Sequence, residues 1–174
     1  MKKVLFFMLA AMFVPVVGDA AALTGLYQTI DDKTNQPKSI VALYEYTDDD
    51  DVALAGRIVA LYGPDGKIAE TIANPVKVAD KVKGAPKFVG LDIIWDMEWD
   101  DDDAQYEDGK IMDPQSGKVY SSVIWQDAPG TLNVRGKIGP IGRTQHWRTL
   151  DAAAMPAELK NIDMSKWTPK TGNK

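Results

Sequence analysis

The 174-residue chain contains no cysteine and a single histidine, His146. The missing cysteines exclude disulfides, thiol nucleophiles, cysteine-ligated zinc and the acylated cysteine of a bacterial lipoprotein. One histidine cannot build a metal site of two or three imidazoles, and no glycine-rich phosphate loop lies between a strand and a helix. The domain must therefore be stabilised by its own hydrophobic core, which a chain of this length can form.

Positive charge is also scarce, with 20 Lys and Arg against 25 Asp and Glu and a net charge of −5. Nucleic-acid affinity depends on cations that neutralise phosphates, so nucleic acid is not an expected partner. Two unbroken aspartate runs, 48–51 and 100–103, contain the most concentrated negative charge. A calcium loop alternates its ligands and turns at a glycine, whereas these runs are typical of solvated loops. No metal or cofactor is predicted.

Residues 1–20 have the three parts of a secretory signal peptide. Two lysines precede an apolar stretch over 4–17, and small residues follow at Gly18 and Ala20. The apolar stretch is shorter than the roughly 20 residues of a membrane-spanning helix. We therefore expect cleavage after Ala20 or Ala22 and a periplasmic or secreted mature protein without a stable membrane anchor.

From 23 to 150, apolar and polar residues alternate with a period of two, and turn sequences rich in Gly, Pro and Asp interrupt the pattern. The clearest stretch is 89–99, where an apolar row alternates with a mostly acidic one. About eight strands are predicted, with at most one short strand within the long connection 67–87. The strands delimited by turns cover 39–47, 52–62, 89–99, 105–112, 118–126, 131–138 and 141–149.

Short strands with tight connections and no helical period between them indicate an all-β fold. We predict an up-and-down antiparallel β-barrel of about eight strands over residues 21–150, with a β-sandwich as the alternative. The tail 151–174 is expected to be irregular, or to form a short helix over 152–160. Trp167 in this tail is available to pack back on the barrel.

Several motifs in one order resemble the DUF2147 family of exported bacterial proteins, over about 23–149. The resemblance implies a calycin-like barrel similar to fatty-acid-binding proteins and implies no activity, because the function of the family is unknown. Tyr27 stands where the family usually has tryptophan. The motifs are Gly25-Leu26-Tyr27, Ile30–Thr34, Lys38–Val41, Gly90–Trp95, Tyr106–Pro114, Gly117–Tyr120, Val134-Arg135-Gly136 and Gly142–Arg148.

Arg143, Gln145 and Trp147 occupy alternate positions (the same parity) of the last predicted strand, 141–149, and therefore share one face of it. If this row faces the barrel interior, Arg143 can hold a ligand carboxylate through charge-assisted hydrogen bonds. The favoured alternative is architectural: Arg143 or Arg148 stacks on Tyr27 and closes one end of the barrel. The sequence leaves open which row of this strand points inward.

Other candidates for a ligand site come from the preceding strands. Arg57 shares its parity with small and apolar residues, which makes it a second candidate for an interior charge. Trp95 and Trp125 lie on apolar parities and could line a cavity, although filling the core is the favoured explanation for them. Tyr27 completes the set of candidate ligand-binding residues.

Catalysis has little support in this sequence. His146 has no nucleophile-elbow serine to accompany it, and abundant carboxylates in an acidic protein do not by themselves form a catalytic pair. The predicted function is non-enzymatic binding of a small apolar or fatty-acid-like molecule. The alternative is an envelope interaction or accessory protein with a filled barrel.

Overall fold

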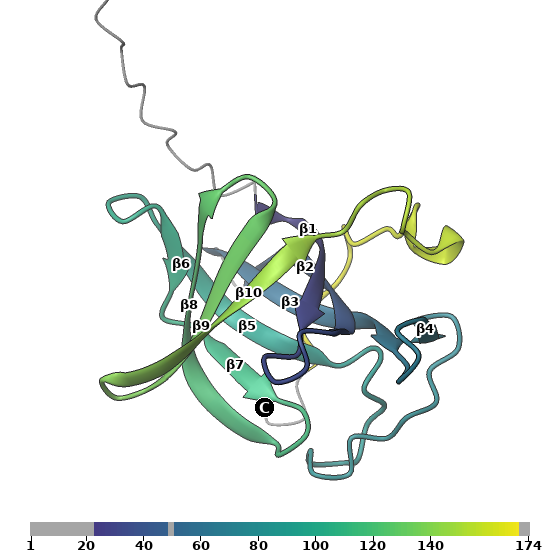
Figure 1. Ribbon diagram of the computed structural model, residues 1–174. Helices are drawn as coiled ribbons and strands as arrows, with labels where there is room; N and C mark the ends of the chain where they lie inside the picture. Colours follow the sequence, from purple (N-terminus) through teal and green to yellow (C-terminus); the bar gives the residue numbers. More distant parts are fainter. Residues whose placement is uncertain (1–22, 49–50, 171–174) are drawn as a thin grey trace, which may run out of the picture.

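Ten β-strands form almost all of the regular structure in the computed structural model, which describes residues 23–48 and 51–170 (Figure 1). The predicted signal peptide lies outside the described residues. No described helix is long and apolar enough to cross a membrane. The strands are β1 (Gly25–Ile30), β2 (Pro37–Asp48), β3 (Asp51–Tyr62), β4 (Ile68–Thr71), β5 (Asp92–Asp100), β6 (Gln105–Glu107), β7 (Lys110–Asp113), β8 (Lys118–Ala128), β9 (Thr131–Ile138) and β10 (Ile141–Thr149).

The strands close into one antiparallel barrel with eight strand positions. β3, β2, β1, β10, β9 and β8 pair in that order, β5 pairs with β3, and β6 and β7 share the position between β8 and β5. β4 pairs only with β3, outside the closed circuit. The predicted all-β up-and-down barrel is confirmed, and the sandwich alternative is wrong because pairing of β3 with β5 closes the sheet.

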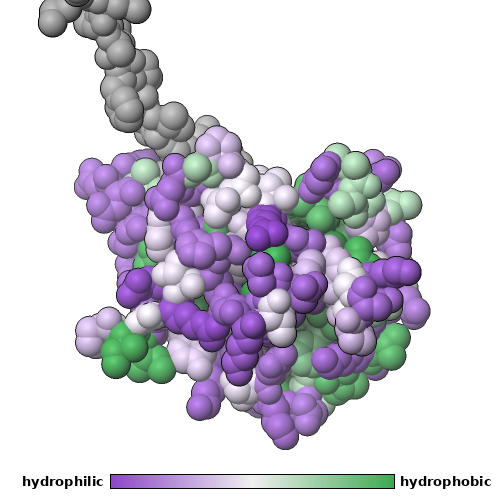
Figure 2. Space-filling view, in the orientation of Figure 1, coloured by the Kyte–Doolittle hydropathy of each residue, from purple (hydrophilic) through white to green (hydrophobic). Residues whose placement is uncertain are grey.

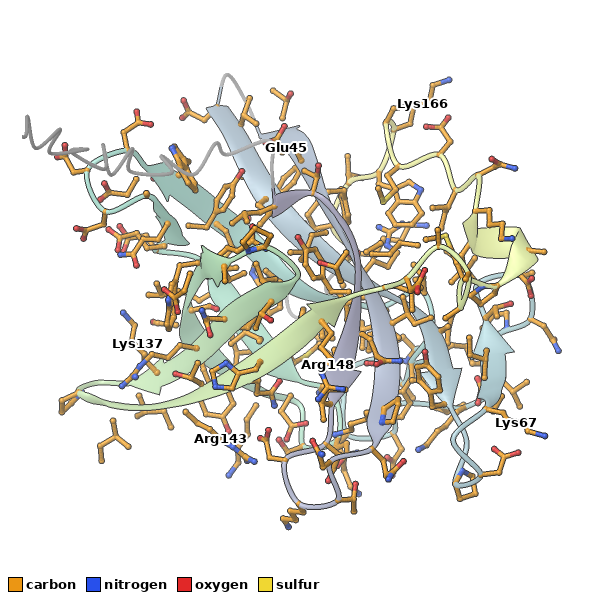
Figure 3. The ribbon with its side chains drawn as sticks, turned by 45° about the horizontal axis from the view of Figure 1, so that its top comes forward. Glu45, Lys67, Lys137, Arg143, Arg148 and Lys166 are labelled. Carbon is orange, nitrogen blue, oxygen red and sulfur yellow. The ribbon has the colours of Figure 1, made fainter. Side chains whose placement is uncertain are left out.

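Because neighbouring strands run in opposite directions, the connections fall into two groups at opposite ends of the barrel. The β1–β2, β7–β8 and β9–β10 connections lie at one end, here called the mouth end. The β2–β3, β5–β6 and β8–β9 connections lie at the other, here called the closed end. Figure 3 shows Arg143 and Glu45 at these opposite ends.

Large apolar side chains fill the closed half of the barrel. The main core cluster includes the fully buried Leu43, Leu54, Met97, Ile124 and Leu132 from five strands. This packing is what an eight-stranded barrel requires of its inward-facing residues.

The predicted strand 105–112 is divided in the structure into β6 and β7. Asp108 adopts a φ of 58°, and Gly109 lies so close to β5 that a Cβ there would be 2.7 Å from the backbone atoms Asp96 O and Met97 N. Only glycine fits this approach, so the break is encoded by the Asp-Gly pair.

The C-terminal segment 151–170 is irregular except for the 3₁₀ turn Ala157–Leu159. A helix over 152–160 is therefore not formed, since Pro156 removes a backbone donor in the middle of that stretch. The segment packs across the outer face of β2 and β3, where Leu159 and Trp167 contact apolar side chains of those strands. The barrel wall is thus buried on both faces at β2 and β3.

Candidate functional site

A cavity of about 620 Å³ occupies the mouth half of the barrel. Side chains from β1, β2, β3, β5, β7, β8, β9 and β10 line it, together with the β1–β2 and β7–β8 connections. The inner wall is apolar: Ile58, Ile93, Met112, Val134 and Trp147 contribute to the lining and also belong to the buried core. An apolar chamber with one polar end is the usual architecture of a small-molecule site.

A few polar groups interrupt this apolar wall. The hydroxyls of Thr29 and Ser39 lie 2.7 Å apart and satisfy each other. Trp147 Nε1 donates to Gln145 Oε1 at 3.0 Å, which fixes the amide of Gln145. Because the Trp147 bond occupies Oε1, the NH₂ group is what Gln145 can offer to a ligand acceptor.

Ser122 has the one buried side-chain polar atom without a hydrogen-bond partner among the described residues. It pairs with the cavity-lining Gly136 across β8 and β9. Its hydroxyl is an unsatisfied polar group beside the chamber.

Charged side chains of both signs surround the mouth of the cavity. Arg143 forms an ion pair with Asp32 of the β1–β2 connection, and the Arg143 side chain is 66% exposed. Lys33 and Lys38 lie on the same rim. Backbone amides of Thr34 and Lys33 donate to Asp31 and hold the pKa of that carboxyl below its usual range. The mouth therefore offers cations to a ligand carboxylate, one of them through exchange with Asp32.

The structure brings Arg143, Gln145 and Trp147 together in the cavity lining, so this row of β10 faces inward. Stacking of an arginine on Tyr27 is wrong: the described cation–π contacts involve only Arg57 and Lys77, on other rings. Tyr27 and Trp95 are buried in the main core cluster and do not line the cavity.

Trp125 lies on the outer face of β8, the opposite face from the buried core residue Ile124. It lines a shallow outer groove with Arg135 and Lys137, so its interior placement was wrong. The sequence assigned the wrong parity because Val119, Val123 and Trp125 form an apolar row, whereas Ile124 fills the core from the other row.

Arg57 also faces outward, beneath the C-terminal segment, which corrects its interior placement. It donates to Asp92 at 2.9 Å through Nη2 and at 3.1 Å through Nε. Nη2 donates as well to the carbonyl oxygen of Thr168, at 2.8 Å, and the guanidinium lies 4.4 Å from the Trp167 ring centre. The small residues on the parity of Arg57 leave room for this segment rather than for a ligand.

Three carboxylates at the closed end, those of Asp100, Asp103 and Glu107, have oxygens within 4.8 Å of one another. Asp100 Oδ1 accepts the backbone amides of Asp102 and Asp103 at 2.8 and 3.1 Å, so the turn itself explains part of this grouping. At the exposed His146, Nδ1 lies 2.8 Å from Asn133 Oδ1.

An antiparallel eight-stranded barrel with an internal cavity opening at one end is the architecture of a lipocalin-like fold. The chain belongs to the bacterial family described as "Uncharacterized protein conserved in bacteria (DUF2147)", whose model matches residues 25–149.

One solved structure, protein HP1028 from Helicobacter pylori, is described as belonging to the lipocalin family. It is similar to this chain with a TM-score of 0.51 and 22% sequence identity, over 75% of this chain and 84% of that one. A comparison with curated proteins finds no match. Together these findings establish the family and the fold.

Proposed function

We propose that the protein is a non-enzymatic carrier or receptor of a small amphipathic molecule, with an apolar body and a carboxylate. The observation that carries this proposal is the cavity of about 620 Å³, apolar within and charged at its mouth. Ligand sites usually measure about 300–1,000 Å³ and combine apolar walls with a few polar groups. A completely filled barrel would instead support the alternative of an accessory protein.

In this proposal the apolar body of the ligand packs between Ile58, Ile93 and Trp147, and the carboxylate meets Arg143 at the mouth. The existing partner of Arg143 is Asp32, in a solvent-exposed ion pair. Exposed pairs stabilise a protein by about 0–1 kcal/mol, so exchanging Asp32 for a ligand carboxylate costs little. The NH₂ group of Gln145 is a further donor within the chamber.

The test is calorimetric titration of the protein with laurate, with 1-dodecanol as the uncharged comparison. Gly136→Met places a side chain in the cavity and should abolish laurate binding. Lys137→Met adds the same side chain at the next residue of β9, on the outer face, and should leave binding unchanged. Equal binding by both variants would refute the proposed site.

A second variant tests the role of the charge at the mouth. Arg143→Gln should weaken laurate binding about tenfold, because a charge-assisted hydrogen bond is lost, and should leave 1-dodecanol binding unchanged. A similar loss for both probes would show that Arg143 does not recognise the carboxylate.

We also propose that the mature protein acts in the periplasm or outside the cell. The support is the sequence of residues 1–20, with its two lysines, its apolar stretch and the small residues Gly18 and Ala20. The mass of the N-terminal peptide of the exported protein tests this, and a retained Met1 would contradict it.

A further inference from the structure

Exposed apolar side chains are concentrated at the mouth end of the barrel. Ile138 and Ile141, at the tip of the β9–β10 hairpin, are 68% and 77% exposed. They pair directly across the hairpin, so their side chains lie together. Figure 2 shows the corresponding apolar surface at the lower left of the molecule. Because these two exposed isoleucines lie side by side, we treat the hairpin tip as a candidate contact surface.

Other exposed apolar residues belong to the same end. Val119 is the second residue of β8, beside the β7–β8 turn, and Val76 and Val78 lie in the connection between β4 and β5. This connection lies against the β7–β8 turn, because Lys81 O is beside Gly117. Of the large exposed hydrophobic residues in the described chain, only Val52 is at the closed end.

Cations accompany these apolar side chains, whereas the acidic runs lie at the far end. The hairpin sequence between Lys137 and Arg143 contains no acidic residue. The connection over 77–87 contains four lysines and one aspartate, and all four lysines are exposed. The run Asp100–Asp103 covers the last residue of β5 and the first three residues of the β5–β6 connection, at the closed end. The other mouth-end connections, 31–38, 63–67 and 113–118, contain four aspartates and four lysines, so the excess of cations in the hairpin and in 77–87 remains. A negatively charged surface would therefore attract the mouth end and repel the closed end.

We propose that the mouth end docks on the surface of a membrane that contains anionic lipids. Ile138 and Ile141 insert at the level of the headgroups, and Lys137 with the lysines of 77–87 contacts the phosphates. An apolar hairpin tip flanked by cations fits a lipid interface, because burial of apolar area and attraction to anionic lipids both strengthen binding there. The opening of the cavity then faces the lipid, and headgroup phosphates compete with Asp32 for Arg143.

The proposal is independent of ligand binding and is tested without a ligand. The chain from Leu23 onward contains every strand of the closed barrel and lacks the apolar stretch 4–17, which would bind lipid by itself. This protein is sedimented with vesicles of phosphatidylcholine, or of equal parts phosphatidylcholine and phosphatidylglycerol. Binding to the anionic vesicles is expected to exceed binding to the neutral ones, and to decrease as salt is added.

Ile138→Ser combined with Ile141→Ser should reduce the fraction bound to anionic vesicles about tenfold, since two apolar side chains are removed from the interface. Val52→Ser, an exposed apolar residue at the closed end, is the matched control and should bind like the original protein. Circular dichroism checks that both variants are folded.

Equal vesicle binding by the double variant and the original protein, or no binding to anionic vesicles, would overturn the proposal. Laurate titration of the double variant separates this result from the proposed function, because the isoleucines lie at the rim and most of the cavity wall is untouched. Loss of vesicle binding with retained laurate binding is the expected outcome.

Discussion

Replacing Arg57 by leucine tests the buried network that fastens the C-terminal segment to the barrel. The Arg57 side chain is 6% exposed and that of Asp92 is 0% exposed. In Arg57→Leu, Asp92 keeps hydrogen bonds from Tyr44 and from the backbone amide of Lys170 but loses its cation. Leaving a buried charge without its partner costs about 3–5 kcal/mol, and we predict a decrease of that size in the free energy of unfolding.

Urea denaturation followed by tryptophan fluorescence measures this decrease. The matched control is Arg57→Leu combined with Asp92→Leu, which removes both charges. Apolar replacement of a whole buried pair is often neutral or stabilising, so the double variant should recover most of the lost stability. If the single variant loses less than about 1 kcal/mol, or the double variant is less stable than the single one, the network does not act as argued.

The same substitution should loosen the C-terminal segment before the barrel unfolds. Arg57 holds Thr168 through its carbonyl oxygen and lies over the ring of Trp167. Figure 3 shows Lys166 on this segment. Trypsin should cleave after Lys166 faster in Arg57→Leu than in the original protein, and mass spectrometry of the released peptide measures the rate. Unchanged cleavage would show that the segment is held by its apolar contacts alone.

Two further predictions concern stability. Burial raises the pKa of Tyr27, and burial together with the Asp92 charge raises that of Tyr44. Unfolded tyrosine ionises at about pH 10, so the free energy of unfolding should fall as pH rises above that value. Over the same pH range, the urea midpoint of Tyr27→Phe should fall less than that of the original protein. Gly109→Ala should cost about 1–3 kcal/mol, because its Cβ would lie 2.7 Å from the backbone atoms Asp96 O and Met97 N, which cannot move aside as a side chain can. In Gly136→Ala the nearest contact of the new Cβ would be Ile111 Cγ2, at 3.4 Å. This substitution should change the free energy of unfolding by less than about 0.5 kcal/mol, as measured by thermal denaturation.

The barrel was predictable because its signals are local. Alternation with a period of two and turn residues depend on neighbours in the chain, and β9 and β10 have the predicted bounds 131–138 and 141–149. Where two rows of one strand are both partly apolar, the local signal is ambiguous. Trp125 was placed inside for that reason, whereas Ile124 fills the core.

Part of the candidate site was also predictable. Arg143, Gln145 and Trp147 share a parity, and parity alone put them on one face. Arg57 also shares its parity with small and apolar residues, and it was expected inside the barrel for that reason. It lies on the outer face, where the C-terminal segment, more than 100 residues away in the chain, covers it. Contacts between distant segments leave no periodic trace in the sequence.

Side-chain spacing and backbone preference along the chain were enough to predict the class of the fold, the alternation of each strand and the positions of most turns. Which face of each strand became the interior, and which part of the barrel was filled, depended on contacts between distant segments. The tertiary structure also placed the exposed isoleucines and lysines at the mouth end and the Asp100–Asp103 run at the closed end. The physical reason is that closure of the barrel fixes which side chains compete for one enclosed volume, and that competition is not local in the chain.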